Sequence, residues 1–441
     1  RIASMTKSFT AASIMLLVER GALSLADPVS RFVPEFGAVR LPTSDSPQVT
    51  VGMLLTMSGG LPSDDPWADR QESMSREEFG RLLAGGIRFV TDPGTSYGYS
   101  NLGYAALGCV VGAVGDLPYH EFVARHLLGP LGMTSTGFDT SVAARGGVAT
   151  GHVRQDGRWE ALPFSEPGVF SAMGGLFSTV EDLARWVSWL AGAFPPRDDG
   201  DSGPLSRASR RAMQQVHRAV PPSGDEGGEP MTVGYGHGLV IHHDQGLGAL
   251  VSHSGGYPGF GSHMRWHPRT GLGVVTLTNA RYVTGTAKAM AALRAVLADV
   301  DGAPAGEALW PETVRARAAV ERLLREWDTA AAGSLFADNV DLDLDLDRRR
   351  KRIQSRVEEV GPLLEPAAPD ELIRSDSPAH VMWRVRGARG VLRCEIALTP
   401  QEPPRVQTLD VTVEEPAPSA TGAPAVPETT ATRPAATGSG A

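Results

Sequence analysis

Apolar positions recur along the chain with two different periods, which separate helical from strand-forming stretches. In the first part the interval is three to four residues and predicts a helix over 4–20, which Ser4 can cap and Gly21 ends. Its apolar face is formed by Met5, Phe9, Ala12 and Leu16. Up to residue 193, further helical segments alternate with loops rich in glycine and proline; they include 101–114 and 180–190. We expect 194–230, which holds two Pro-Pro pairs and an Asp/Gly run, to be an exposed insertion.

Strand patterning begins at Thr232 and continues to residue 278. Two hairpins are predicted, which join 235–242 to 249–253 and 262–267 to 273–278. An amphipathic helix over 286–300 follows and could cover one face of the resulting sheet. The pattern therefore predicts a first domain of mixed α/β (α+β) class over residues 1–300.

A second unit is expected after a linker at 301–311. Apolar residues at helical spacing (Val320, Leu323, Leu324 and Trp327) precede three predicted strands at 380–385, 391–398 and 405–413. This pattern predicts a small accessory α+β domain over 312–414. The remaining 415–441 is rich in Pro, Ala, Thr and Gly, with Val426 as its only large aliphatic residue, so we expect a disordered tail.

Composition narrows the possible functions. The 441 residues are 41% hydrophobic and 21% charged, which allows two or three folded domains. The net charge of −9 argues against nucleic-acid binding, and no apolar run reaches the ~18 residues of a membrane span. The two cysteines, Cys109 and Cys394, are too few for a disulfide framework or a cysteine zinc cluster, and Cys109 is expected to be a packed, inert thiol.

Lysine is scarce, and the chain begins without methionine. Lys7, Lys288 and Lys351 are the only lysines among 41 basic residues, so each is a candidate for a specific role. The first residue, Arg1, stands directly before an element typical of a domain interior. We therefore expect a fragment or processed chain whose start, with any signal peptide, is missing. The compartment and the oligomeric state are left open.

The first candidate site is the Ser-Met-Thr-Lys stretch 4–7. Residues at i and i+3 share one face of a helix, so the Lys7 amine would lie one turn from the Ser4 hydroxyl. A neutral lysine with a pKa lowered by burial can take the proton of an alcohol and make it a nucleophile. The alternative is a capping serine followed by an exposed lysine.

The second candidate is the Tyr-Ser-Asn stretch 99–101, just before an apolar helix. The phenol of Tyr99 could move a proton to or from a serine, and the amide of Asn101 could orient a substrate and a lysine. The alternative is that Tyr99 packs in the core while Asn101 caps the helix.

The third candidate is the His-Ser-Gly-Gly stretch 253–256, at the predicted end of a strand. Small residues such as Gly255 let a substrate lie against a strand, and the Gly256 N–H can face a developing oxyanion. The alternative is a strand-end turn in which His253 has ordinary hydrogen-bond partners.

Taken together, these three stretches resemble the serine beta-lactamase, penicillin-binding protein and esterase superfamily, in particular its class C-like branch. That group has the order Ser-x-x-Lys, Tyr-x-Asn, then Lys/His-x-Gly, which is the order found here. Similar flanking segments are 1–3, 54–62, 130–133, 174–179 and 258–260. The resemblance covers residues 1–300 and implies an antiparallel sheet flanked by helices, with an inserted all-helical region. Family members have a helix and edge strands before the nucleophile, so we expect truncation of a complete enzyme.

The resemblance also implies a role for each motif residue. Ser4 would be the acyl-accepting nucleophile, with Lys7 and Tyr99 sharing proton transfer. Asn101, His253, Gly255 and Gly256 would bind substrate, and the N–H groups of Ser4 and Gly256 would form the oxyanion hole. No metal or cofactor is implied.

The resemblance implies a serine hydrolase for a small ester, amide or peptide. Dedicated beta-lactamases carry a lysine at the position of His253, and a largely neutral histidine loses that cationic carboxylate anchor. We therefore expect hydrolysis of carboxylesters, or of small amides and peptides, through an acyl-Ser4 intermediate. The alternatives are D-Ala-D-Ala carboxypeptidase or beta-lactamase activity, or a penicillin-binding sensor that does not turn over.

Other motifs favour ordinary structural roles. The Gly-x-Ser-x-Gly stretch 94–98 follows turn residues rather than a strand, so Ser96 is expected in a loop. His242 and His243 would point to opposite faces of a strand, while His263 and His267 lack an obvious third ligand. The Asp/Leu alternation at 341–346 lacks calcium-loop residues and predicts a half-buried strand. The basic run 348–352 that follows is expected either to pair with those acids or to lie on a solvated helix face.

Overall fold

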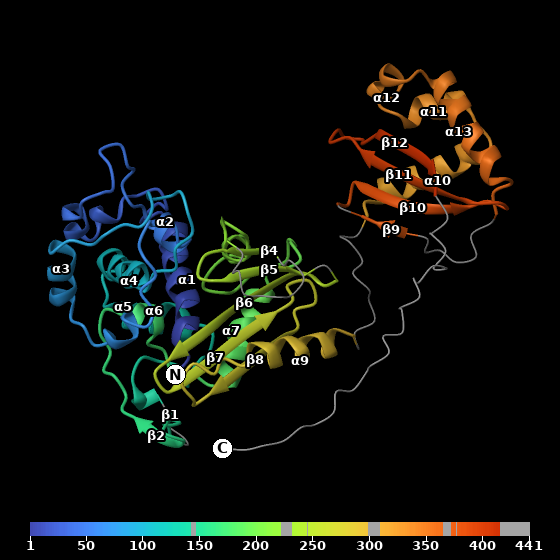
Figure 1. Ribbon diagram of the computed structural model, residues 1–441. Coiled ribbons are helices and arrows are strands. Elements are labelled where there is room, and N and C mark those ends of the chain that lie inside the picture. The colour runs from blue at the N-terminus through green and yellow to red at the C-terminus, as the bar shows by residue number, and fades with distance from the viewer. Residues whose placement is uncertain are drawn as a thin grey trace, which may run out of the picture. The chain divides into compact units, whose positions relative to one another are not determined.

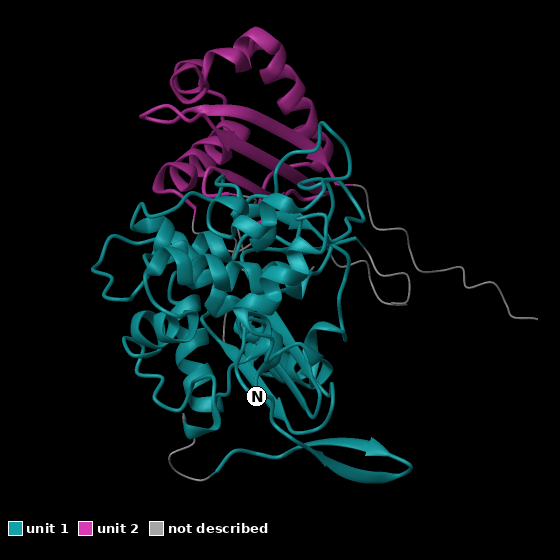
Figure 2. Ribbon diagram, turned by 90° about the vertical axis from the view of Figure 1, so that its left-hand side faces the viewer, with its two compact units in different colours: residues 1–301 teal, residues 302–441 magenta. Residues whose placement is uncertain are grey.

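The described residues of the computed structural model are 1–142, 147–221, 232–244, 246–298, 309–364, 372–375 and 377–414. They belong to two compact units, 1–301 and 302–441 (Figure 2). Each unit has a hydrophobic core of its own. The predicted tail at 415–441 and residues 301–308 of the predicted linker lie outside the described residues.

Helices α4, α5, α6 and α8 of unit 1 pack against one buried central helix, α1 (Figure 1). The helical elements are η1 (Ala3–Met5), α1 (Thr6–Glu19), η2 (Val29–Arg31), η3 (Pro34–Ala38), α2 (Val51–Leu55), η4 (Ala68–Arg70), α3 (Arg76–Ala84), α4 (Asn101–Gly115), α5 (Tyr119–Val123), η5 (Ala124–Leu128), η6 (Thr140–Val142), α6 (Ser171–Gly174), α7 (Val180–Ala191), α8 (Arg207–Met213) and α9 (Thr286–Ala298). The predicted helices at 101–114 and 180–190 are confirmed by α4 and α7.

Helix α1 is buried on nearly all sides, not on the single face that the sequence predicted. Three buried hydroxyls of the helix are accommodated because each donates to a backbone carbonyl. Ser8 donates to Met5 O, Thr10 donates to Ala172 O, and Ser13 donates to the carbonyl one turn earlier. The helix therefore passes through the core of unit 1 without leaving these hydroxyls unpaired.

An antiparallel sheet of six strands lies beside the helices in the order β3-β4-β5-β6-β7-β8 (Figure 1). The strands are β3 (Arg218–Ala219), β4 (Thr232–Tyr235), β5 (Val240–Asp244), β6 (Gly248–Tyr257), β7 (Phe260–Trp266) and β8 (Gly273–Thr278). Helices α7 and α9 both pack against β7 and β8. The structure thus has the mixed helix and sheet architecture that the sequence predicted.

The predicted single strand at 235–242 is wrong. The chain reverses after Tyr235, which pairs directly with Val240, so this segment contributes to two strands. Gly238 makes the reversal possible because it has φ of +70° and lies so near the Lys7 carbonyl that a Cβ atom would be 2.5 Å from its oxygen. The turn therefore also supports the start of α1.

The family resemblance implied an inserted all-helical region, but the part of the chain before α7 also contains two strands. Strands β1 (Gly151–Gln155) and β2 (Arg158–Leu162) form a separate hairpin. Its two-residue turn is Asp156-Gly157, with φ values of +47° and +78°. Asp-Gly is a strong hairpin signal, so this element could have been found in the sequence.

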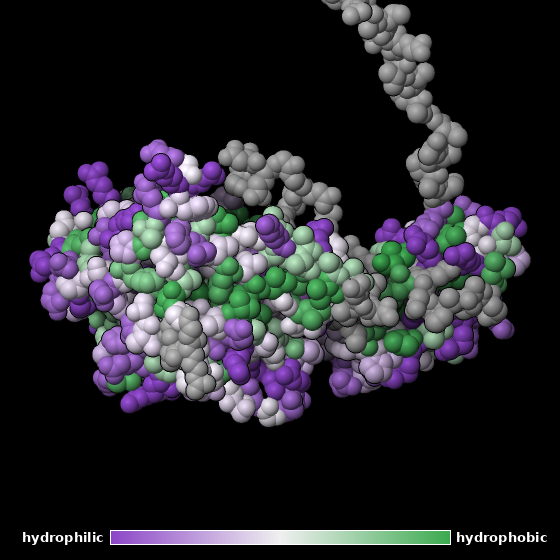
Figure 3. All heavy atoms as spheres, turned by 90° about the horizontal axis from the view of Figure 1, so that it is seen from below, coloured by the Kyte–Doolittle hydropathy of each residue, from purple (hydrophilic) through white to green (hydrophobic). Residues whose placement is uncertain are grey.

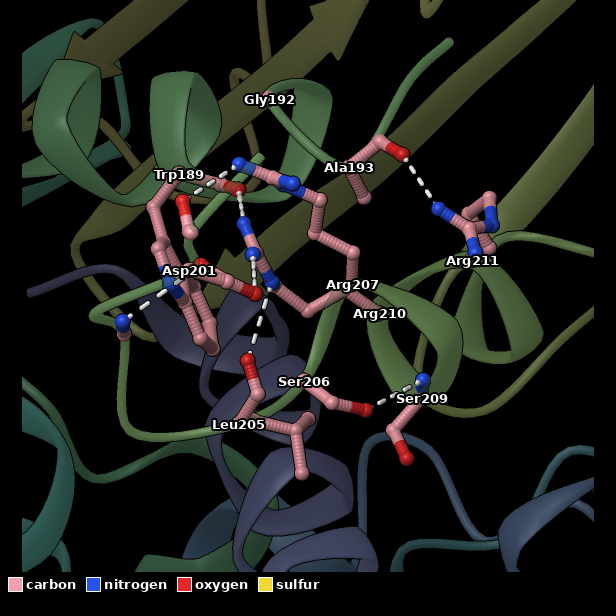
Figure 4. Close-up of polar contacts among 12 residues, drawn as sticks. Trp189, Gly192, Ala193, Asp201, Leu205, Ser206, Arg207, Ser209, Arg210 and Arg211 are labelled. Carbon is pink, nitrogen blue, oxygen red and sulfur yellow. Dashed lines mark hydrogen bonds and ion pairs between the residues drawn. The ribbon is translucent and has the colours of Figure 1, made fainter. Parts of the chain in front are cut away.

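Residues 195–203 are exposed, as predicted for this segment, but the short helix α8 that follows them is anchored in unit 1; 222–230 lies outside the described residues. Figure 4 shows the anchor: Arg210 on α8 donates to the carbonyls of Trp189 and Leu205 and forms an ion pair of 2.6 Å with Asp201. The Arg210 side chain is almost completely buried, as is Leu205. The proline and glycine content of this segment indicates exposure and gives no sign of this anchor, whose partners lie on other elements.

Unit 2 has a four-stranded antiparallel sheet in the order β12-β11-β10-β9, with helices against it. Its elements are α10 (Pro311–Arg325), α11 (Thr329–Leu335), α12 (Asp338–Asp343), α13 (Leu346–Val360), β9 (Leu372–Arg374), β10 (His380–Arg386), β11 (Val391–Leu398) and β12 (Val406–Val413). The three predicted strands correspond to β10, β11 and β12.

The predicted strand at 341–346 is wrong, because this segment spans the end of α12 and the start of α13. Asp345 caps α13 by accepting from the Arg348 N–H, and Asp341 accepts from the Leu346 N–H. Leu342 is 85% exposed, so the Asp/Leu alternation reflects helix capping rather than a buried strand face.

On the face of unit 1 seen in Figure 3, hydrophobic residues gather in a surface patch. Exposed large hydrophobic side chains of unit 1 include Trp67, Val90, Trp159 and Val283. Within the described residues no single helix is long and apolar enough to cross a membrane. The segments Asn101–Gly115 and Tyr119–Leu128 pass that test together, but they are bent by 74°.

Candidate active site

Ser4 lies where the edge of the helical part meets the sheet. It belongs to the short turn η1, which packs against β6 and β7. Ser262 on β7 donates to Ile2 O at 2.7 Å. Gly255 on β6 lies so close that a Cβ atom would be 2.3 Å from the same carbonyl oxygen. Gly255 therefore permits the contact that positions the Ser4 turn, and it is not among the residues that line the adjoining cleft.

The Lys7 amine lies against the Ser4 hydroxyl. Lys7 Nζ donates to Ser4 Oγ at 3.0 Å and to Met173 O at 2.8 Å, and the Lys7 side chain is completely buried. No capping hydrogen bond from the Ser4 side chain is present at α1, so the alternative of a capping serine with an exposed lysine is wrong.

Burial lowers the pKa of Lys7 from 10.5 to about 8. Four carboxylates oppose this effect by favouring the charged amine: Asp65, Asp69, Asp64 and Glu72, in order of decreasing effect. At a pKa of about 8, roughly a tenth of the lysine is neutral at pH 7, and this is the form that can accept a proton from Ser4.

Tyr99 is brought to the same place from just before α4. Its ring lies 5.0 Å from Lys7 Nζ, and it lines the same cleft as Ser4. Burial raises the pKa of Tyr99 well above its ordinary value, and a hydrogen bond with the Ser4 side chain opposes this only in part. The phenol is therefore protonated at neutral pH and can donate a hydrogen bond.

Asn101 lies in a different arrangement from the one expected. Its carboxamide Nδ2 donates to Asp64 at 3.1 Å and to Asp65 at 2.5 Å, and no hydrogen bond to Lys7 is recorded for it. Its Oδ1 atom is buried without a partner among the described residues. The cap of α4 is Ser100, which accepts from the Gly103 N–H, so the capping alternative for Asn101 is also wrong.

His253 lies on β6, which continues as far as Tyr257, so 253–256 is inside a strand rather than at its end. His253 Nε2 is 3.3 Å from Tyr235 Oη, and Nδ1 is 2.6 Å from Ser254 O. Burial, with the nearby Lys7 charge, lowers the pKa of His253 to about 3. The imidazole is therefore neutral and does not supply a fixed positive charge.

A cleft of about 630 Å³ joins these residues. It is lined by Ser4, Asp65, Pro66, Asp69, Tyr99, Val240, His242, Ser252, His253, Ser254, Gly256, His263, Arg265, Tyr282 and Thr286. The structure therefore brings together Ser4, Lys7, Tyr99, His253 and Gly256, while Asn101 and Gly255 support the site from outside its lining.

The acidic residues around Lys7 were missed by the sequence analysis. Asp64, Asp65, Asp69 and Glu72 fall in one short acidic segment that gave no motif. Asp69 accepts from Tyr282 Oη at 2.8 Å, and burial raises its pKa to about 6. Glu72 forms a buried ion pair with Arg1 at 3.3 Å. The only signal in the sequence was the local density of carboxylates before Asn101.

Of the remaining motifs, His242 and His263 line the cleft, whereas the Gly-x-Ser-x-Gly stretch does not. Ser96 is exposed in a loop and does not line the cleft, as predicted. No group of three or more metal-ligating side chains occurs in the part of the chain that the structure describes. Burial raises the pKa of Cys109 to about 11, in keeping with an unreactive thiol.

Comparison with known proteins identifies related sequences and folds. The Beta-lactamase family model matches residues 1–299. Protein flp of Staphylococcus aureus (strain COL) is 28% identical over 281 residues, covering 63% of this chain and 52% of the relative. The chain thus spans about half the length of the curated relatives it first matches.

Two further similarities extend this comparison. The D-alanyl-D-alanine-carboxypeptidase/endopeptidase AmpH of Escherichia coli (strain K12) is 25% identical over 297 residues, covering 64% of this chain and 71% of the relative. The octameric penicillin-binding protein homologue from Pyrococcus abyssi is a structural neighbour with a TM-score of 0.57 and 24% identity. That match covers 94% of this chain and 86% of the neighbour. The second similarity is evidence for the fold alone.

Proposed function

The chain belongs to the beta-lactamase family, and on that basis we propose that it is a serine hydrolase for carboxylesters or small amides and peptides. The observation that carries the proposal is the 3.0 Å contact between Lys7 Nζ and Ser4 Oγ at a lysine that burial keeps partly neutral. A buried amine beside an alcohol at the wall of a cleft is suited to activating a nucleophile.

In the proposed reaction neutral Lys7 takes the Ser4 proton while Ser4 Oγ attacks the substrate carbonyl. The N–H groups of Ser4 and Gly256 would stabilise the oxyanion. The proton returns to the leaving alcohol or amine through Lys7 and Tyr99, the bond to the leaving group breaks, and an acyl-Ser4 ester remains. Neutral Lys7 then takes a proton from water while the water oxygen attacks the acyl carbon; the ester bond to Ser4 Oγ breaks, the acid leaves, and the proton passes from Lys7 to Ser4 Oγ.

Small esters, amides or peptides are favoured over beta-lactams because His253 is neutral. A neutral imidazole gives a substrate carboxylate no fixed positive charge next to Ser4. D-alanyl-D-alanine carboxypeptidase or beta-lactamase activity is the second candidate, and the similarity to AmpH supports it. The third is a sensor that becomes acylated without turning over.

The decisive experiment compares Ser4→Ala with Ser96→Ala. We expect the unaltered chain and Ser96→Ala to hydrolyse p-nitrophenyl butyrate, and Ser4→Ala to lose at least a thousandfold in kcat/KM, because the nucleophile is absent. Nitrocefin and a D-alanyl-D-alanine peptide, tested in parallel, separate the first two candidates. A phosphonate or fluorescent beta-lactam adduct at Ser4 without turnover would favour the sensor, and activity that survives in Ser4→Ala would refute the mechanism.

A further inference from the structure

Three buried side-chain nitrogens on one wall of the cleft have no hydrogen-bond partner within the described chain. They are Arg265 Nε, His263 Nε2 and His242 Nδ1. All three residues line the cleft that contains Ser4. Buried donors are normally satisfied, so a cluster of unsatisfied ones at a cleft indicates a place where a ligand supplies acceptors.

The sheet places these groups on one face. His263 and Arg265 are two residues apart on β7, and they pair with Ser254 and Ser252 on β6. Ser254 Oγ lies 2.8 Å from His263 Nδ1, and Ser252 Oγ lies 2.9 Å from His242 Nε2. If each serine hydroxyl donates to the imidazole nitrogen that it contacts, the proton of each neutral ring is on the other nitrogen. The protonated nitrogens are then His242 Nδ1 and His263 Nε2, which are the two without a partner.

Arg265 has no hydrogen bond or ion pair recorded, although only 6% of the residue is exposed. The carboxylate that most influences it, Asp244, is itself bound to Arg294 at 2.6 Å. Burial, with Arg265 nearby, lowers the pKa of His242 to about 4 and that of His263 to about 3. A guanidinium between two neutral imidazole donors repels a cation and suits an anion.

Other charged groups on the cleft lining have the opposite sign. Asp65 and Asp69 line the cleft as well, and both act electrostatically on Lys7. The carboxylates therefore belong to the neighbourhood of Ser4, whereas Arg265 pairs with Ser252, four residues along β6 from Gly256. The charges along the cleft would orient a substrate with its anionic end toward Arg265.

We propose that Arg265, with His242 and His263, binds a carboxylate at one end of the substrate and selects peptides over simple esters. The proposal rests on the proposed hydrolase function and narrows its substrate class. Four strand residues span ~13 Å, so the carboxylate would lie about two to four extended residues from the reacting carbonyl, depending on the reach of the arginine.

The test measures competition by N-acetylated oligoglycines of two to four residues, each as the free acid and as the C-terminal amide. These probes are achiral, and each pair differs only in the terminal charge. For the unaltered chain, the inhibition constant against p-nitrophenyl butyrate hydrolysis should be at least tenfold lower for the acid at the best length. Arg265→Gln should bring the acid-to-amide ratio close to one, while Arg265→Lys retains part of it.

Arg294→Gln is the matched control, because it removes a nearby positive charge that is exposed and outside the cleft lining. It should keep both the ratio and the hydrolysis rate. Should Arg265→Gln fail to fold, His263→Gln should still reduce the ratio. Calorimetric binding of the same probes to Ser4→Ala decides the question even if the chain hydrolyses nothing. Equal binding of acid and amide, or a preference that survives in Arg265→Gln, would overturn the proposal.

Discussion

Lys7 shows how the surroundings of one residue set its chemistry. Burial of the amine lowers its pKa, while carboxylates at Asp65 and Asp69 raise it, and burial prevails. The result, about 8, keeps the lysine charged part of the time and neutral part of the time near pH 7. An exposed lysine at the same helix position would remain almost fully charged and could not act as a base.

We therefore expect kcat/KM for an uncharged ester to rise with pH up to a pKa of about 8 and then level off, because the neutral amine dominates above its pKa. Asp69→Asn removes a negative charge that favours the ammonium, so this limb should move to lower pH by roughly half to one pH unit. Tyr282→Phe removes the hydrogen bond to Asp69 but keeps the carboxylate, and it should shift the limb less. An unchanged profile in Asp69→Asn would contradict this account of the lysine.

At the scale of elements, the sequence predicted best where local signals decide. Helix α7 has both a capping threonine and a regular apolar face, and its position was predicted closely. The prediction of a single strand over 235–242 was wrong because the chain reversal there depends on how Gly238 fits against α1, which is remote in sequence. Helix α8 was placed in an exposed segment because its anchor, Arg210, has partners on other elements.

Arg210→Ala should lower the free energy of unfolding by about 3–5 kcal/mol, because it leaves buried carbonyls and Asp201 without their partner. Denaturant unfolding followed by tryptophan fluorescence measures this loss. Arg185→Ala is the control. The Arg185 side chain is 61% exposed, and its distance of 4.0 Å from Asp182 makes a weak ion pair, so the substitution should change the free energy of unfolding by less than about 1 kcal/mol. Equal effects of the two substitutions would show that the α8 anchor is not important for stability.

At the scale of the whole molecule, the described residues of each unit form a main hydrophobic core of their own. The core of unit 1 surrounds α1 and includes Trp186, while that of unit 2 lies against β10 and includes Trp383. Both tryptophans are fully buried. The proposed catalytic residues all come from unit 1, so the chemistry should depend on the first core and not on the second.

Trp383→Ala should destabilise unit 2 by about 3–5 kcal/mol, because it leaves a large cavity. Differential scanning calorimetry should show the unfolding transition of unit 2 at a lower temperature and that of unit 1 unchanged. Trp186→Ala is the matched substitution in unit 1 and should move the other transition. Hydrolysis of p-nitrophenyl butyrate at 25 °C should persist in Trp383→Ala; its loss would show that unit 2 contributes to the reaction.

The sequence by itself predicted that Ser4 and Lys7 lie one helical turn apart, because residues three apart on a helical turn share a face. It also predicted the family, through the order of its motifs. Only the tertiary structure decided that Lys7 is buried, that carboxylates from 64–72 act on it, and that Arg265 lines the same cleft. Desolvation and electrostatic interactions depend on distances in space, and for these groups the folded chain sets those distances between residues far apart in sequence.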